Sequence, residues 1–322
     1  MPCLPFPGDW AGKGEAGWKR KQGAFDPDRV WVSEDMSGRE GGDISEMKPI
    51  TAMRGQEIDR IKGVLFDIDD TFTLAGRLIP EAFSSLWKLH DRGLVLVPIT
   101  GRPAGWCDHI ARMWPVDGVV GENGAFYYCY CTRERRLLRR YVCEPEAARE
   151  KRARLEEIRQ EVLQRVPGAG VAADQHFRLF DLAIDFSEDV PALCPADIRE
   201  ICEVFKKHDA TCKVSSIHVN GWFGDYDKLT TTKLFLRERL GLEWEEARQS
   251  FLFIGDSPND EPMFEAFPLS VGVANLSRFA PMMKFVPMFI TAGQGGLGFA
   301  EMANLIADDS ARKTNHREGR LP

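Results

Sequence analysis

The stretch of sequence that decides the fold is VLFDIDDT, residues 64–71. Apolar or small residues fill positions 63–66, as expected of a strand that is buried within a sheet. The carboxylates of Asp67 and Asp69 follow where this strand must end, and strand ends are where α/β sheets place their chemistry. Because turns are also rich in Asp, this stretch alone does not separate a catalytic loop from a structural turn.

The composition indicates a soluble globular protein. Of the 322 residues, 43% are hydrophobic and 28% are charged, and the length suggests roughly two domains. The formal net charge of -7 argues against nucleic acid as a partner, because a nucleic-acid surface needs clustered Lys and Arg. It favours a small substrate that is brought to a locally neutralised site.

The sequence shows no signal for insertion into a membrane or for secretion. No apolar stretch approaches the roughly 20 residues of a membrane-spanning helix, and no secretory signal opens the chain. The eight cysteines have no ligand-like spacing apart from the Cys129–Cys131 pair, which argues against a zinc site. We therefore expect a cytoplasmic protein with reduced thiols and no membrane partner, and the sequence gives no oligomeric state.

Strands alternate with helices from Ile61 onward, which predicts an α/β fold of the Rossmann-like kind, with a parallel sheet covered on both faces. The first elements are a strand at 61–66, a helix at 80–91, a strand at 94–99, a helix at 104–113 and a strand at 116–120. The pattern resumes with a helix at 229–240, a strand at 251–254, a helix at 259–266, short strands at 270–273 and 285–290, and a helix at 297–306.

Residues 127–220 interrupt this alternation with short strands and a long charged helix at 146–166, which predicts an inserted α+β domain whose charged helix is a solvated face. Residues 1–60 lack periodicity, so we expect disorder or loose packing there, or translation that starts at Met47 or Met53. The predicted division is an extension at 1–60, a core at 61–126 and 221–306, an insert at 127–220 and a flexible tail at 307–322.

A second chemical segment is VLVPITGRP, residues 95–103, in which a strand ends in Thr100 before a glycine turn. The Thr100 hydroxyl and the backbone N–H groups beyond it can face an anion. Thr100 can equally cap the following helix, and capping does not exclude contact with a phosphate. Gly101 and Arg102 are candidate substrate-binding residues of the same turn.

A third segment is GDYDKLT, residues 224–230, where a turn precedes a helix and Lys228 stands at its opening. A lysine in this place can meet a phosphate from one side. Lys233 is a competing candidate, but five positions further on it lies about 140° round the helix. Most lysines are only solvated surface charges, so Lys228 is a candidate only in combination with the other segments described here.

The fourth segment is FLFIGDSPND, residues 251–260, another apolar strand that ends in carboxylates. Carboxylates at two strand ends can converge on one hard cation, and Mg²⁺ suits them because it takes oxygen ligands while binding substrate phosphate. On its own, the segment would be a turn in which Asp256 or Asn259 caps a helix.

Together the four segments fit phosphoryl transfer, which needs a nucleophile, a proton donor and positive charge. Asp67 can attack phosphorus and Asp69 can carry the proton. Mg²⁺ and Lys228 can neutralise charge, and Thr100 can hold a phosphoryl oxygen.

These segments resemble, in the same order, the four motifs of the haloacid dehalogenase (HAD) superfamily of phosphatases, over residues 61 to about 306. The stretch GENGA, residues 121–125, resembles the segment before the large cap in sucrose-phosphatase-like and Cof-like members. The resemblance implies a Rossmann-like core with the insert as an α/β cap. One departure is Asp70, where the family usually has glycine.

By this resemblance Asp67 is the aspartyl-phosphate nucleophile and Asp69 the general acid/base. The Asp67 carboxylate, the Asp69 backbone carbonyl and Asp256 would hold Mg²⁺. Asn259 and Asp260 would support that site, while Thr100 and Lys228 would bind the phosphoryl group.

Further substrate contacts are expected from the insert. Arg178 is a candidate for a second anionic group, and Asn220 lies where the insert rejoins the core, although a structural role is an alternative for both. The glycine-rich stretch GQGGLG, residues 293–298, satisfies a dinucleotide-binding pattern. The chain ends too soon after it for the rest of that unit, so a helix entry that closes the sheet suffices.

The predicted function is a Mg²⁺-dependent phosphatase that hydrolyses a small phosphorylated metabolite, with a sugar phosphate as the substrate class that the resemblance implies. A phosphomutase of the same superfamily is one alternative. A non-catalytic regulator that binds a phosphorylated ligand is another, although the intact set of Asp67, Asp69, Lys228 and Asp256 speaks against it.

Overall fold

The computed structural model describes residues 47–143 and 145–318. All described residues belong to one compact unit of the chain. The predicted loose extension therefore lies outside the described residues as far as residue 46.

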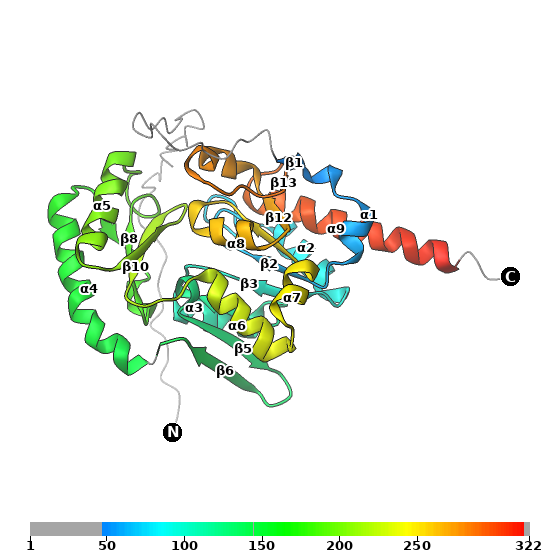
Figure 1. Ribbon diagram of the computed structural model, residues 1–322, viewed down its shortest axis with the longest axis horizontal. Helices are drawn as coiled ribbons and strands as arrows, with labels where there is room; N and C mark the ends of the chain where they lie inside the picture. Colours follow the sequence, from blue (N-terminus) through cyan, green and yellow to red (C-terminus); the bar gives the residue numbers. More distant parts are fainter. Residues whose placement is uncertain (1–46, 144, 319–322) are drawn as a thin grey trace, which may run out of the picture. The chain divides into compact units, whose positions relative to one another are not determined.

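A six-stranded parallel sheet forms the centre of this unit (Figure 1). Its order is β1 (Lys48–Pro49), β13 (Phe289–Ile290), β12 (Leu269–Gly272), β11 (Phe251–Gly255), β2 (Gly63–Phe66) and β3 (Val95–Pro98). The strands β2 and β11 lie side by side and are buried throughout, which explains why both are continuous apolar runs. The predicted α/β class with a parallel sheet is confirmed.

Helices cover both faces of the sheet because side chains along a strand point alternately to opposite faces. Val64 and Phe66 pack into one hydrophobic cluster, and Leu65 packs into the other. The first face is covered by α1 (Gly55–Asp59), α2 (Pro80–Asp91) and α9 (Gly295–Glu318). The second is covered by α6 (Lys228–Leu240), α7 (Trp244–Ser250) and α8 (Glu261–Ala266).

A second, four-stranded antiparallel sheet has the order β7 (Gly170–Val171), β8 (Asp181–Asp185), β10 (His218–Trp222) and β9 (Thr211–Val214). Apolar side chains of α4 (Pro145–Arg165) and α5 (Pro195–Lys207) form one hydrophobic cluster with this sheet. We call residues 145–222 the cap. The α+β character predicted for the insert is confirmed.

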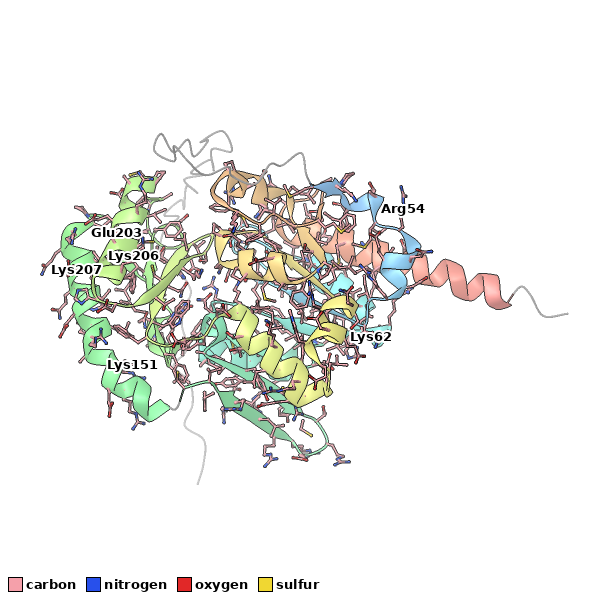
Figure 2. All side chains as sticks on the ribbon, viewed as in Figure 1. Arg54, Lys62, Lys151, Glu203, Lys206 and Lys207 are labelled. Carbon is pink, nitrogen blue, oxygen red and sulfur yellow. The ribbon has the colours of Figure 1, made fainter. Side chains whose placement is uncertain are left out.

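The outer sides of α4 and α5 carry charged side chains that pair at the surface (Figure 2). Lys206 Nζ lies 2.7 Å from a carboxylate oxygen of Glu203, and Lys207 Nζ lies 2.8 Å from one of Glu161. Glu161 lies on the helix that was predicted to present a solvated face, and surface ion pairs of this kind contribute little to stability.

A third sheet joins the two regions and differs from the prediction. Strands β4 (Val119–Gly121), β5 (Phe126–Cys131) and β6 (Arg136–Tyr141) pair in an antiparallel arrangement. The β5–β6 hairpin was expected in the insert, but Tyr127 and Cys129 pack with the side chains of the central sheet, so the hairpin continues the core. Helix α3 (Ala104–Met113) precedes β4.

Two segments outside the predicted core are ordered elements. Residues 47–60 form β1, a 3-10 helix and α1, because Ile50, Met53 and Ile58 bury against the first cluster. Helix α9 continues to Glu318, beyond the predicted helix end at 306.

The short 3-10 helices are η2 (Ile50–Ala52), η3 (Glu122–Gly124), η4 (Gln175–Phe177), η5 (Pro258–Asp260), η6 (Ala274–Arg278) and η7 (Ala280–Met282). Within residues 47–143 and 145–318, each helix is too short or too polar to cross a lipid bilayer.

Candidate active site

Three carboxylates meet at the carboxyl ends of β2 and β11. The strands are in register, with Phe66 opposite Ile254, and the Asp67 N–H donates to the Ile254 carbonyl at 3.0 Å. One carboxylate oxygen from each of Asp67, Asp256 and Asp260 lies within 4.8 Å of the others, and all three residues are buried. The two strand ends therefore deliver their acidic groups to one place.

Lys228 is the first residue of α6, and its side chain contacts this cluster of three carboxylates. Its Nζ lies 2.7 Å from Asp67 Oδ1 and 2.7 Å from Asp260 Oδ1. Burial acts to lower the pKa of Lys228, but the two carboxylates outweigh burial and raise it, so the side chain stays charged. Lys233, the competing candidate, instead places its ammonium 4.3 Å from the centre of the Trp244 ring.

The acidic group carries more negative charge than one lysine can balance. Burial raises the pKa of Asp67 to about 8, with a further contribution from Asp260, while Lys228 opposes the shift. Burial and the neighbouring Asp67 also raise the pKa of Asp256. Such a site gains stability from an added cation, because the cation favours the ionised carboxylates.

Asp260 acts as a support for this group. Its Oδ1 accepts from Lys228, and its Oδ2 accepts from the backbone N–H groups of Asp256 and Ser257 at 3.1 and 3.3 Å. A Cβ on Gly255 would lie only 2.5 Å from Asp260 Oδ2, so glycine is required there. Asn259 lies beside it and accepts from the Ser257 hydroxyl at 2.9 Å.

Asn275, which the sequence analysis did not single out, lies beyond the end of β12. Its Nδ2 donates to Asp256 Oδ2 at 3.1 Å and to the Asp70 carbonyl at 3.0 Å. Its Oδ1 accepts from the N–H of Gly295, which belongs to the glycine-rich stretch, at 2.9 Å. Asn275 therefore links the loop after β2, the carboxylate after β11 and the start of α9.

Thr100 is fully buried and does not cap α3, whose N-cap is Pro103. Its Oγ1 accepts from the N–H of Arg102 at 3.0 Å. The hydroxyl proton therefore remains available to donate, since an accepting hydroxyl keeps its own O–H.

The carboxylate of Asp69 is separate from the acidic group, because it pairs with Arg102. The Nη2 of Arg102 lies 2.7 Å from Asp69 Oδ1, and its Nε donates at 2.9 Å. The same guanidinium reaches two cap residues, Glu188 at 2.6 Å and Asp174 at 3.3 Å. Arg102 thus connects the loop after β2 to the cap.

Asp70 adopts a φ of 55°, which is the left-handed region that glycine enters most easily. This conformation explains why glycine is usual at the corresponding position of the HAD motif that residues 64–71 resemble. Aspartate is among the few other residues that tolerate this region, so Asp70 can adopt the conformation that glycine favours.

The cap residues predicted to bind substrate form an internal network. Arg178 is buried and paired with Asp174 at 3.0 Å and Asp181 at 3.1 Å, and its Nη1 donates to the Gly101 carbonyl at 2.8 Å. Asn220 donates to Asp181 at 2.9 Å. These contacts connect the cap to the turn after β3, and the expected contact of Arg178 with a second anionic group stays a prediction.

The fold matches solved structures at low sequence identity. The C-terminal domain of the Candida albicans trehalose-6-phosphate phosphatase is 16% identical, with a TM-score of 0.58 over 79% of this chain and 94% of that chain. A sucrose-phosphatase from Synechocystis, solved with sucrose and phosphate, is 18% identical, with a TM-score of 0.53 over 76% and 98%. A HAD/Cof-like putative hydrolase from Plasmodium vivax is 15% identical, with a TM-score of 0.55 over 80% and 98%. No family model and no curated protein sequence matches this chain.

Proposed function

We propose that this chain, which has the fold of HAD phosphatases and hydrolases, is a Mg²⁺-dependent phosphatase that acts on a small phosphorylated metabolite. The observation that carries the proposal is the group formed by Asp67, Asp256, Asp260 and Lys228 at the ends of β2 and β11. Buried carboxylates around one buried ammonium suit a nucleophile that must meet an anionic substrate.

The donor set fits Mg²⁺, which takes oxygen ligands and is bound through one or two carboxylates together with substrate phosphate. Asp67 and Asp256 are the side chains that would hold the ion, with the Asp69 backbone carbonyl as the third protein ligand. Both Asp260 oxygens already accept hydrogen bonds, which favours a supporting role for this residue. When bound, Mg²⁺ would reduce the repulsion between the Asp67 carboxylate and the phosphoryl group.

The proposed reaction has two steps. An Asp67 oxygen attacks phosphorus, the bond from phosphorus to the leaving oxygen breaks, and Asp69 gives that oxygen a proton. Asp69 then takes a proton from the water that hydrolyses the aspartyl phosphate and regenerates Asp67. Lys228 holds Asp67 in position and balances charge in both steps, and the Thr100 hydroxyl donates to a phosphoryl oxygen.

In this arrangement Asp69 pairs with Arg102, which is itself paired with the cap. We infer that Asp69 is freed when substrate enters and the cap moves. A proton donor must lie within hydrogen-bond reach of the leaving oxygen, and structures without substrate often hold such groups elsewhere.

Two considerations support a sugar phosphate as the substrate. The cap residues Asp174 and Glu188 pair with Arg102, which also pairs with Asp69, so the leaving group must fit between the cap and the core. Two of the matched structures are a trehalose-6-phosphate phosphatase and a sucrose-phosphatase.

The proposal is tested by a phosphate-release screen over phosphorylated sugars and other small metabolites with Mg²⁺. Release of free phosphate without a bisphosphate activator identifies a phosphatase and excludes a mutase. Asp67→Asn is the control, and it should lose at least about 1000-fold in kcat because it lacks the nucleophile. Equal activity in wild type and Asp67→Asn would refute the proposed chemistry.

A further inference from the structure

A strained turn separates β4 from β5. All three residues of η3 have positive φ: 43° at Glu122, 53° at Asn123 and 107° at Gly124. The left-handed region costs a non-glycine residue free energy, so two such residues in succession need strong support from their surroundings.

The support comes from the segments that carry the phosphate-binding candidates. The N–H of Asn123 donates to the Thr100 carbonyl at 3.1 Å. A Cβ on Gly124 would lie 2.1 Å from the Asp227 carbonyl oxygen, so the turn packs directly against the residue before Lys228. The turn therefore places Asn123 next to both Thr100 and the start of α6.

Glu122 fixes the same turn to the cap. Its carboxylate accepts from the N–H groups of Leu179 and Phe180 in the cap, at 2.9 and 2.7 Å, and from Ala104 in α3 at 3.0 Å. The backbone of Asn123 is thus held by its own bond to Thr100 and by the side-chain contacts of the preceding residue, Glu122.

The side-chain amide of Asn123 takes no part in the hydrogen bonds that hold the turn. The residue is 2% exposed, and a Cβ on Gly101 would lie 3.1 Å from its Nδ2. Within the described residues, neither Oδ1 nor Nδ2 of Asn123 has a hydrogen-bond partner. Three other buried asparagines near the site, Asn220, Asn259 and Asn275, each use amide atoms in hydrogen bonds.

A buried amide without partners costs free energy, and so does its left-handed backbone. Both costs are explained if the amide serves a ligand. Asn123 bonds to the Thr100 carbonyl, and the next residue, Gly124, packs against the backbone at Lys228, so a phosphoryl group held by Thr100 and Lys228 would lie close to Asn123. We propose that Asn123 is a substrate-binding residue whose Nδ2 donates to a phosphoryl oxygen held between Thr100 and Lys228. This inference rests on the proposed phosphatase function.

The test measures the affinity of the full chain for inorganic phosphate by titration calorimetry, with Mg²⁺ present throughout. Asn123→Gly removes the amide and relieves the strain, and Asn123→Asp keeps the shape but replaces the donor with a negative charge. We expect phosphate affinity to fall about 10- to 100-fold in Asn123→Gly, and further in Asn123→Asp, because a hydrogen bond to a charged group is lost. The Tm of Asn123→Gly should not fall, whereas replacing an asparagine with a purely structural role would lower it.

Asp209→Gly is the matched control, since Asp209 is an exposed left-handed residue after α5 with a φ of 55°. It should leave phosphate affinity unchanged. Loss of phosphate affinity in both Asn123 variants supports the proposal, and affinity within twofold of wild type in either one overturns it. A wild-type protein that neither binds phosphate nor hydrolyses a phosphomonoester would refute the proposed function instead.

Discussion

Asp67 makes the protein sensitive to pH, because burial raises the pKa of its carboxyl from 3.8 to about 8. In the unfolded chain it ionises near 3.8, so between that pH and about 8 the folded state binds more protons. Its contribution to stability is complete below about pH 4 and is lost as the pH rises through about 8.

We therefore expect the Tm without divalent metal, measured by scanning calorimetry with a chelator, to fall as the pH rises from 5 to 8. Mg²⁺ should reduce the slope because it favours ionised Asp67, and Asp67→Asn should reduce it without metal. Equal slopes for wild type and Asp67→Asn would show that another group controls the stability.

Lys228 is the second decisive residue, because it is the buried cation between Asp67 and Asp260. Lys228→Met leaves two buried carboxylates without their partner, which should cost about 3–5 kcal/mol of unfolding free energy and about 1000-fold in kcat. Denaturant titration and phosphate-release kinetics measure the two effects. Lys233→Met, on the same helix, should keep wild-type kcat, and an equal loss in both variants would contradict the role of Lys228.

At the scale of elements, the glycine-rich stretch at 293–298 contacts the loop that follows β2. The N–H of Gly296 donates to the Thr73 carbonyl at 2.9 Å, and a Cβ on Gly295 would lie 2.4 Å from the same oxygen. The predicted helix entry that closes the sheet agrees with this packing. Glycine is needed because two backbones approach closely.

Asn275 connects that stretch to Asp256, so it should affect metal binding without being a ligand. We expect Asn275→Ala to weaken Mg²⁺ binding about 10-fold, because second-layer partners of metal ligands have effects of that size. Titration calorimetry with Mg²⁺ measures it. Asn304→Ala is the control, since Asn304 accepts from the exposed Lys88 at 2.8 Å. Unchanged Mg²⁺ affinity in Asn275→Ala would show that Asp256 is positioned by other contacts.

The strand ends could be predicted from the sequence because an apolar run followed by polar residues is a local signal. Asn275 carries the same signal, since it lies just beyond the end of β12, and the same rule applied to every strand would have found it. The partners of Arg102 could not be predicted, because Asp174 and Glu188 lie 72 and 86 residues away in the chain and have no motif. Long-range ion pairs arise only from tertiary packing.

At the scale of the whole molecule, Arg102 connects the cap to the core through Glu188 and Asp174. Burial would raise the pKa of Glu188, but the neighbouring His218 and Arg102 lower it to about 2, so the carboxylate stays charged at neutral pH. Movement of the cap must therefore break ion pairs.

We expect Glu188→Gln to release product phosphate about five times faster, which corresponds to about 1 kcal/mol, because Arg102 loses one ion pair to the cap and keeps the pair with Asp174. Stopped-flow measurement with a phosphate sensor checks this rate. Glu203→Gln, which removes an exposed pair elsewhere in the cap, should leave the rate unchanged. Equal rates in wild type and Glu188→Gln would exclude this pair as the barrier to release.

Glu122 restricts how the cap can move relative to the core. Its one carboxylate holds backbone N–H groups of both α3 and the cap, far along the chain from each other. Lifting the cap as a rigid block would break the hydrogen bonds from Leu179 and Phe180 and leave the buried carboxylate with the N–H of Ala104 as its remaining donor among these three. A rotation of the cap about Glu122 would keep these hydrogen bonds, so we expect cap residues far from Glu122 to move more than Leu179 and Phe180.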